Sequence, residues 1–304
     1  MSFPEFKTKI ERGDTVILYL SVTSIFPLQV EPKMTNKKGS LVDNIFQTVY
    51  GALRVSDLEG QRYGTKVALS KGWALVLAPT CDLWTQCLPH RTQILYTPDI
   101  SLIVAQLELR PGSKVVEAGT GSGSLSHSIL RTVKPDGELH TFDFHEGRAD
   151  AAREEFALHG YKEPLVRVAH RDVCALGFDP VAAASVDAVF LDLPCPWDAI
   201  GHARKVLRPG GRIAIFSPCV EQVVRTKEVL LKSDFFETET IECLCKELSV
   251  QYRTHGKLHL DGNEEQERYL TSLPCASIPG HSGFLTFATL KPWATPCRSP
   301  ILIS

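Results

Sequence analysis

From about residue 112 onward, short apolar runs alternate with segments that have helical spacing. The run KVVEAG precedes SLSHSILRTV, and the same pattern returns in VDAVFLDLP, PWDAIGHARKVL and RPGGRIAIFSP. A strand, a crossover helix and a second strand can pair in parallel, because the helix covers one face of the sheet. This alternation predicts an α/β fold with a doubly wound, mostly parallel sheet.

The last two apolar runs of this region, FFETETIECL and GHSGFLTFATLKP, have no helical segment between them. They predict an antiparallel pair at one edge of the sheet. The polar connection at about residues 258–280 is predicted to be a mobile loop, and residues 293–304 a disordered tail.

The first part of the chain has a different pattern. Residues 1–88 contain short β-like runs such as DTVILYL and WALVLAP, separated by glycines. Such spacing is typical of a small all-β unit, here predicted to be barrel-like. A chain of 304 residues can hold two unequal domains. We therefore expect an N-terminal β domain at 1–88 and an α/β domain at 89–292.

Composition excludes several classes of protein. The formal charge is -2, so a nucleic-acid site must be a local patch or be shared with a partner. No apolar run approaches the roughly 20 residues of a membrane span, and the N-terminus lacks the apolar region of a signal peptide. The nine cysteines are scattered without the spacing of a zinc site, so we expect reduced thiols, an intracellular protein and no metal.

A glycine-rich loop follows the apolar run KVVEA. Glu117, Gly119, Gly121 and Gly123 form the pattern acid-x-Gly-x-Gly-x-Gly between a predicted strand and a predicted helix. A nicotinamide oxidoreductase is the main rival, but it expects glycine where Ser124 stands. The loop resembles motif I of S-adenosyl-L-methionine-dependent class I methyltransferases. It lacks lysine and arginine, which suits a cationic ligand without phosphates.

Three acids end the strands that follow. Asp143 is expected to accept hydrogen bonds from the ribose of the cofactor, the alternative being a helix N-cap. Asp172 is expected near the adenine amino group, the alternative being a turn residue. Asp192 ends the fourth strand beside the topological switch point, where ligands bind in such sheets.

The segment DLPCPW after that strand resembles the [DN]-P-P-[YFW] signature of methyltransferases that act on nitrogens of bases. Together with LPHRTQILYTPDI, GTGSGSLSHSI, FSPCVEQV and GHSGFLTFAT, it makes residues 8–292 resemble the catalytic subunits of eukaryotic tRNA (adenine-58-N1)-methyltransferases. The resemblance implies a Rossmann-like class I methyltransferase fold with a seven-stranded sheet. It also implies a nuclear enzyme that makes 1-methyladenosine in the tRNA T-loop, with some messenger RNAs as further substrates. The expected assembly is a heterotetramer of two catalytic and two related non-catalytic subunits.

The resemblance also implies the site residues. Asp192 is the expected catalytic carboxylate. The expected cofactor-binding residues are Leu95, Glu117, Gly119, Gly121, Ser122, Gly123, Ser124, Asp143, Arg148, Asp172, Val173 and Asp192. The expected RNA-facing residues are Gly72, Trp73, Leu191, Leu193, Pro194, Phe216, Ser217, Pro218, Cys219, Val220, Glu221, Gln222 and Ser282.

Some of these residues have alternative interpretations. Trp73 is equally consistent with a core aromatic of the β domain. His90 and Arg91 suit either an RNA or subunit contact or a polar lock between domains. Relatives carry histidine where this chain has Ala78, which weakens individual RNA contacts but not the cofactor site. A non-catalytic subunit of the same fold is a further rival, but it is expected to lose the glycines or Asp192.

Overall fold

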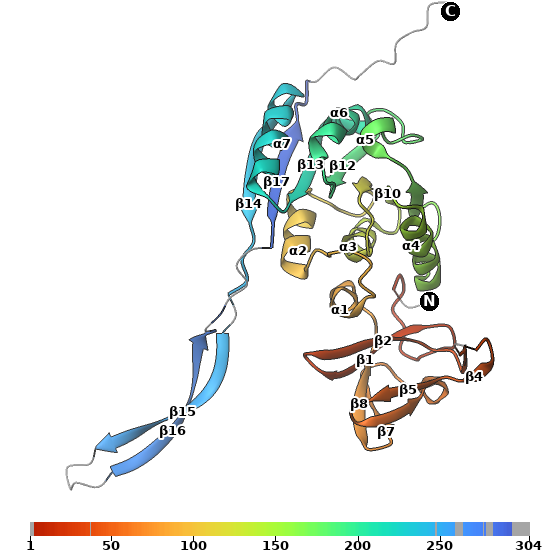
Figure 1. Ribbon diagram of the computed structural model, residues 1–304, viewed down its shortest axis with the longest axis vertical. Coiled ribbons are helices and arrows are strands. Elements are labelled where there is room, and N and C mark those ends of the chain that lie inside the picture. Colours follow the sequence, from red (N-terminus) through yellow and green to blue (C-terminus); the bar gives the residue numbers. More distant parts are fainter. Residues whose placement is uncertain are drawn as a thin grey trace, which may run out of the picture.

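The computed structural model describes residues 3–36, 38–246, 248–258, 264–275, 277 and 282–293. Its largest element is a seven-stranded sheet with the order β11-β10-β9-β12-β13-β17-β14 (Figure 1). The strands are β9 (Lys114–Ala118), β10 (Glu138–Asp143), β11 (Val166–His170), β12 (Val186–Leu191), β13 (Leu207–Ser217), β14 (Phe235–Glu242) and β17 (Phe284–Leu290). Only β17 runs antiparallel to its neighbours in this sheet, which confirms the predicted fold class and the antiparallel edge.

Helices cover both faces of this sheet. One face packs against α2 (Thr97–Gln106), α3 (Ser124–Val133) and α4 (Glu146–His159). The other face packs against α5 (Val173–Leu176), α6 (Pro196–Val206) and α7 (Val220–Lys232). The strands β9 and β12 are buried on both faces, which explains why their sequences are continuous apolar runs. The carboxyl ends of β9, β10 and β12 therefore meet at one edge, next to the switch in strand order.

The N-terminal region forms a smaller β structure with its own core. Its four-stranded sheet has the order β2-β1-β8-β7. The strands are β1 (Thr15–Ser21), β2 (Ser24–Gln29), β7 (Thr65–Leu69) and β8 (Gly72–Leu77). Two ribbons adjoin it, β3 (Lys33–Thr35) with β4 (Leu41–Asp43) and β5 (Ile45–Thr48) with β6 (Gly51–Arg54), followed by the 3-10 turn η1 (Val55–Leu58).

A short helix, α1 (Cys81–Cys87), connects the two β structures and was not predicted. Thr80 caps it by accepting a hydrogen bond from the backbone N–H of Leu83 at 3.1 Å. Trp84 of this helix packs in a small cluster with Ile17 and Ile94. The helix thus ties the N-terminal β structure to the segment that precedes α2. The expected boundary near residue 88 stays a prediction.

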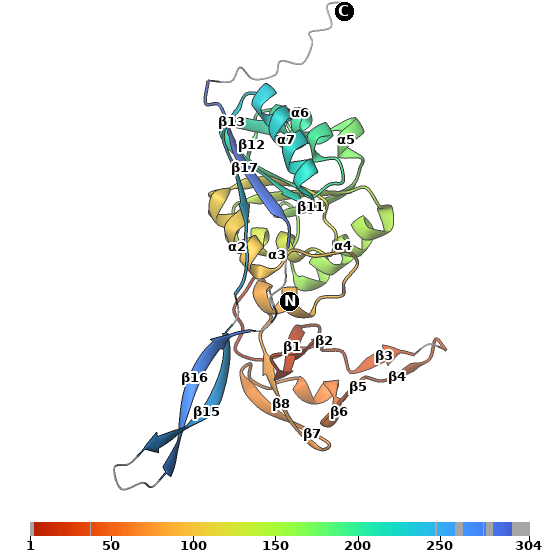
Figure 2. The same cartoon turned by 60° about the vertical axis from the view of Figure 1, so that its left-hand side comes forward.

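The connection between β14 and β17 corrects one prediction. Residues 264–274, expected within a mobile loop, form the strand β16 (Glu264–Pro274), which pairs with β15 (Leu248–Leu258) over 11 residues. Figures 1 and 2 show this ribbon projecting away from the large sheet. Alternating apolar and polar side chains along β15 are the strand signal that the polar composition obscured.

The rest of that predicted loop, residues 259–263, 276 and 278–280, lies outside the described residues, as does the predicted tail beyond Trp293. Within the part of the chain that the structure describes, no helix is long and apolar enough to cross a membrane.

Candidate active site

The glycine loop connects β9 to α3 at the carboxyl edge of the sheet. Its first residues continue the pairing with β10, because the N–H groups of Gly119 and Thr120 donate to the carbonyl of Phe142 at 2.8 and 3.2 Å. Gly119 has a φ of +95°, and a Cβ there would lie 2.3 Å from the carbonyl oxygen of Asp192. The backbone at the end of β12 therefore leaves no room for a side chain at this position.

Asp143 holds this loop from the end of β10. Its Oδ2 accepts from the N–H of Gly121 at 3.0 Å. Its Oδ1 accepts from the N–H of His145 at 2.8 Å and pairs with Arg148 at 2.9 Å. His145, not Asp143, is the N-cap of α4. The two predicted cofactor residues Asp143 and Arg148 thus lie together, with the carboxylate oriented by the loop and by α4.

A pocket lies between the glycine loop, the end of β12 and the segment before α2. It is open to solvent. Eight of the twelve residues predicted for the cofactor line it: Leu95, Glu117, Gly119, Gly121, Ser122, Gly123, Ser124 and Asp192. Asp143 adjoins it through Gly121. The lining residues include two acids and no lysine or arginine.

Glu117 is the fully buried acid of this pocket. Its Oε2 accepts hydrogen bonds from Ser126 at 2.6 Å and from Thr141 at 2.7 Å. Burial nevertheless raises the pKa of Glu117 to about 7, and the nearby charges of Asp192 and Asp143 act in the same direction. A cationic ligand in the pocket would favour the charged form of Glu117.

Asp192 is positioned by the sheet. Its N–H donates to the carbonyl of Ala118 at 2.9 Å, so the backbone extends the pairing between β12 and β9 by one residue. Burial raises the pKa of its carboxyl group to about 6. No described residue forms a hydrogen bond with this carboxylate. An acid that is held in place but has no partner can receive a donor from a ligand.

The two segments predicted to face the target nucleotide are bound to each other. The amide of Gln222 in α7 donates to the carbonyl of Pro194 at 3.0 Å, and its oxygen accepts from the N–H of Cys219 at 3.2 Å. Cys219 caps α7 in a capping box with this same glutamine. Gln222 therefore joins the Pro-rich loop after Asp192 to the start of α7.

Burial corrects two of the predicted nucleotide contacts. The side chains of Leu191 and Ser217 are fully buried at the ends of β12 and β13, so neither can contact RNA in this conformation. Phe216, Leu193 and Gln222 are partly exposed. The predicted residues that are exposed at this edge are Pro194, Pro218, Cys219, Val220, Glu221 and Ser282.

Asp172 and Val173 do not line the pocket. Asp172 is the N-cap of α5, and its Oδ1 accepts from the N–H groups of Cys174 and Ala175 at 3.0 and 3.2 Å. Val173 is buried in the core beneath α6. Asp172 thus has a local structural role as a helix cap, and its cofactor role stays a prediction.

The remaining predicted residues lie on other elements. Trp73 is 53% exposed on β8, which rules out a core position, and Lys66 Nζ lies 4.0 Å from its ring centroid. Gly72 precedes it at the β7–β8 turn. Ser282 donates to the carbonyl of Cys243 at 3.3 Å, near the start of β17.

Several pocket residues were not predicted. They are Thr92, Gln93, Ile94, Thr120, Leu125 and Phe190. Thr92, Gln93 and Ile94 adjoin Leu95 in the same extended segment. The only sequence signal for these three residues is that they directly precede Leu95, which was predicted to contact the cofactor.

Comparisons with known proteins agree with this geometry. A sequence model of the family described as tRNA methyltransferase complex GCD14 subunit matches residues 72–270. The tRNA (adenine(58)-N(1))-methyltransferase catalytic subunit of Candida albicans is 43% identical over 257 residues, which cover 83% of this chain and 73% of that protein. The corresponding subunit of Dictyostelium discoideum is 38% identical over 314 residues, covering 93% and 97%.

Solved structures share the fold. A SAM-dependent O-methyltransferase from Thermotoga maritima has a TM-score of 0.74 at 26% identity and covers 96% of each chain. The tRNA (m1A58) methyltransferase TrmI from Aquifex aeolicus has a TM-score of 0.68 at 21% identity, over 92% of this chain and 98% of that one. With its glycine loop, strand-end acids and sequence matches, the chain belongs to the family of tRNA methyltransferase complex GCD14 subunits and has the fold of a class I methyltransferase.

Proposed function

We propose that this chain is the catalytic subunit of a tRNA (adenine-58-N1)-methyltransferase, which transfers a methyl group from S-adenosyl-L-methionine to adenine 58 of the T-loop. The observation that carries the proposal is Asp192, a partly buried carboxylate without a partner at the edge of the glycine-loop pocket. A non-catalytic subunit of this fold would have no use for such a group. The names of the relatives from Candida albicans and Dictyostelium discoideum support the same reaction.

The pocket fits the proposed methyl donor by charge. S-adenosyl-L-methionine carries a positively charged sulfonium, which makes its methyl group electrophilic. Glu117 and Asp192 line the pocket, and its lining includes no lysine or arginine. The pKa of each of the two carboxyl groups is raised. A positive charge nearby would stabilise both carboxylates in the ionised form. The loop residues Gly119, Gly121 and Gly123 leave room for the backbone to approach the ligand.

Asp192 would act on the target base. Adenine N1 has a lone pair, so it needs no deprotonation before methylation. Positive charge then develops on the adenine ring, next to the exocyclic N6 amino group. The ionised Asp192 would accept a hydrogen bond from this amino group and stabilise the charge as it forms. The backbone of Asp192 is fixed by the hydrogen bond from its N–H to the carbonyl of Ala118, so little backbone reorganisation is needed.

The target adenine must leave its stack to reach Asp192. Exposed side chains around the carboxyl edge could receive it, among them Pro194, Pro218 and Cys219. The Gln222 contact with Pro194 holds this rim together at 3.0 Å. We propose that the rim binds the flipped nucleotide and that the N-terminal β region, with Lys66 and Trp73, contacts other parts of the tRNA.

We propose a related non-catalytic subunit as the partner, in a heterotetramer of two catalytic and two non-catalytic chains. The β15–β16 ribbon supports this proposal. Leu248, Val250 and Tyr252 alternate along β15, and the register pairs Tyr252 with Leu270. All four side chains are exposed, so one face of a projecting ribbon is apolar. Such a face is typical of a surface that another chain covers.

We also propose a nuclear location and activity on some messenger RNAs, on the basis of the resemblance to eukaryotic enzymes.

Methyl transfer to tRNA transcripts tests the function. Transcripts with adenine and with guanine at position 58 are incubated with labelled donor and with the chain in complex with its related subunit. The proposal expects label in the first transcript and none in the second. Equal labelling of both transcripts, or of neither, would contradict it.

A further inference from the structure

The segment before α2 holds polar groups of the glycine loop through backbone and side-chain contacts. The N–H of Arg91 donates to Ser122 Oγ at 2.8 Å, and its Nε approaches the carbonyl oxygen of Gly121 at 3.4 Å. The N–H of Thr92 also donates to Ser122 Oγ, at 3.1 Å. The Ser122 hydroxyl therefore binds the segment before α2, and its direction is set from behind the loop.

Arg91 is itself fixed by an ion pair with α4. Its Nη1 lies 2.9 Å from Glu155 Oε2, and the two side chains are only 20% and 11% exposed. A largely buried pair of this kind is costly to break, because one charge would be left without a partner. Arg91 thus links three parts of the chain: the segment before α2, the glycine loop and α4. Both side-chain partners of Arg91 belong to the predicted domain at 89–292, so these contacts do not form the expected lock between domains, and the RNA or subunit contact stays a prediction.

A second contact holds the last glycine of the loop. The Nδ1 of His127 lies 2.7 Å from the carbonyl oxygen of Gly123, and its Nε2 lies 2.8 Å from Nδ1 of His159. A carbonyl can only accept, so His127 carries its hydrogen on Nδ1. The Nε2 of His127 then accepts from the Nδ1–H of His159. Both imidazoles are fully buried among aromatic rings, with Phe3 4.3 Å and Trp84 4.6 Å from His159.

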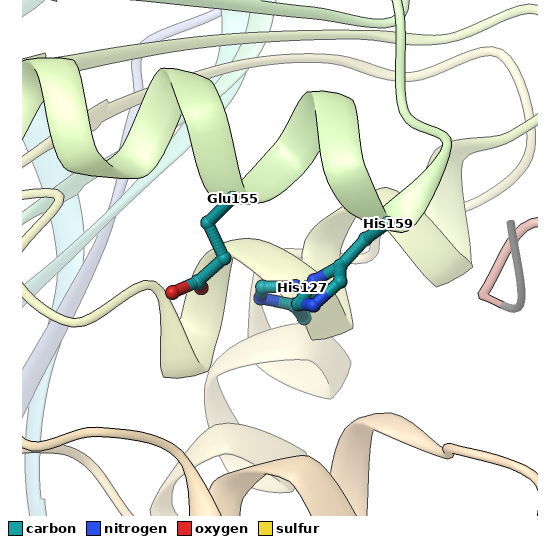
Figure 3. Close-up of side chains that lie close together, drawn as sticks. All are labelled: His127, Glu155 and His159. Carbon is teal, nitrogen blue, oxygen red and sulfur yellow. Dashed lines mark hydrogen bonds between the residues drawn. The ribbon is translucent and has the colours of Figure 1, made fainter. Parts of the chain in front are cut away.

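The same residues must be considered as a metal site. Figure 3 shows His127, Glu155 and His159 together where α3 faces α4, and one possible ligand atom from each lies within 4.8 Å of the others. However, Nδ1 of His127 faces a carbonyl and Nε2 faces the other imidazole, so His127 has no free lone pair. Glu155 already pairs with Arg91, whose charge would repel a cation. The geometry favours a hydrogen-bonded support over a metal site.

We propose that Arg91 with Glu155 and His127 with His159 are positioning residues, which fix the shape of the methyl-donor loop from behind. The two pairs act on adjacent peptide groups, because they hold Gly121, Ser122 and Gly123 in turn. The loop carbonyls and the Ser122 hydroxyl are then held in place before the donor binds. Preorganisation of this kind lowers the cost of binding. The inference rests on the proposed donor site.

Equilibrium binding of S-adenosylhomocysteine to the full-length chain, in the assembly that methylates tRNA, tests the proposal. Arg91→Met removes the Nε contact with Gly121 and the ion pair with Glu155 but keeps the backbone N–H contact with Ser122, and His127→Leu removes the contact with Gly123. We expect each to weaken binding roughly tenfold to a hundredfold, the scale on which small misplacements act. His127→Asn keeps a donor near the position of Nδ1, so its affinity should stay within about threefold of the wild type.

The controls separate positioning from stability. Arg204 of α6 forms an ion pair with Asp234 at 2.6 Å, away from the loop, so Arg204→Met should leave the affinity unchanged. Thermal unfolding of each variant identifies any that fail to fold, and Glu155→Gln provides a milder variant in that case. The KM for tRNA should stay constant while the KM for the methyl donor rises.

Two results would overturn the proposal. The first is wild-type affinity in folded Arg91→Met and His127→Leu, or equal losses in His127→Leu and His127→Asn. The second is a stoichiometric metal ion in the purified wild-type chain that disappears in His159→Leu. Failure of the wild-type chain itself to bind S-adenosylhomocysteine would instead contradict the proposed function.

Discussion

Asp192 combines two properties that rarely occur together at one residue. Its backbone is fixed by the sheet, while its carboxylate has no hydrogen-bond partner among the described residues. Asp192→Asn keeps the shape but removes the charge. We expect kcat to fall roughly 100-fold or more, because transition-state charge is no longer balanced. Binding of S-adenosylhomocysteine, measured by calorimetry, should change little.

Asp198 provides a matched control for this substitution. It lies in the first turn of α6, six residues further along, and is exposed. Asp198→Asn should keep kcat close to that of the wild type. If both variants lose activity equally, the effect comes from the loop or from the net charge and not from Asp192.

The pH dependence of methyl transfer follows from the same residue. Burial raises the pKa of Asp192 to about 6, and only the ionised carboxylate can accept the hydrogen bond without donating one. The kcat, measured with saturating donor and tRNA, should therefore rise as pH increases through about 6 and then level off. A profile between pH 5 and 8 that is flat for the wild type, or that keeps this rise in Asp192→Asn, would contradict the assignment.

Glu117 predicts a change in stability. Its pKa is raised from an ordinary value of 4.5 to about 7 in the folded chain, so the folded state binds more protons between these values. The free energy of unfolding of the donor-free chain should therefore decrease as pH rises from about 4.5 to 7, by on the order of 3 kcal/mol from this group. In Glu117→Gln, the free energy of unfolding, measured with denaturant at several pH values, should change less with pH than in the wild type. At pH 8 the variant should unfold at a higher temperature than the wild type.

The same substitution should weaken binding of the cationic donor, since the pocket loses a negative charge. Thermal unfolding with and without S-adenosyl-L-methionine measures both effects. A variant that is less stable than the wild type at pH 8 without donor would show that Glu117 is a structural residue and not a strained binding group.

At the scale of single residues, the sequence predicted the features that are set by residues adjacent in the chain. The glycine loop and Asp192 could be located because each directly follows a buried strand. The pairing of Arg91 with Glu155 could not, because 64 residues separate them and surface ion pairs look the same in sequence. The burial of Leu191 also depends on packing by α6 and α7, which no local pattern specifies.

Among the elements, the β15–β16 ribbon has the clearest functional consequence. Its apolar face includes Tyr252 and Leu270, which stand opposite each other in the register. Replacing both by serine should abolish co-purification with the related subunit, because the contact would lose its apolar area. The same double replacement of Gln251 and Thr271, the next pair on the opposite face, is the control. Size-exclusion chromatography of co-expressed subunits provides the measurement.

The result can distinguish two uses of the ribbon. Loss of the partner in the apolar-face variant alone supports the proposed interface. Retention of the partner together with a raised KM for tRNA would instead assign this face to RNA.

The ribbon was only partly predicted from the sequence, because its polar residues resemble those of a mobile loop. The helix α1 was missed because its seven residues lie between prolines and are too short for a periodic signal.

On the scale of the whole molecule, the two β structures differ in what they present to a ligand. The large sheet carries the pocket at its carboxyl edge, and the N-terminal region has exposed aromatic and basic side chains such as Trp73 and Lys66. The alternation of strands and helices was sufficient to predict this sheet. The placement of the smaller region and of the ribbon depends on contacts far apart in sequence, which periodicity does not report.

The central claim concerns the position and the atom that are methylated. Unmodified tRNA transcripts are incubated with S-adenosyl-L-methionine and with the chain alone, the related subunit alone or both, and the nucleosides are mapped by mass spectrometry. We predict 1-methyladenosine at position 58, formed by the reconstituted assembly and lost when its catalytic chain carries Asp192→Asn. Methylation at another position or atom, or an assembly that keeps wild-type activity with Asp192→Asn, would contradict the account.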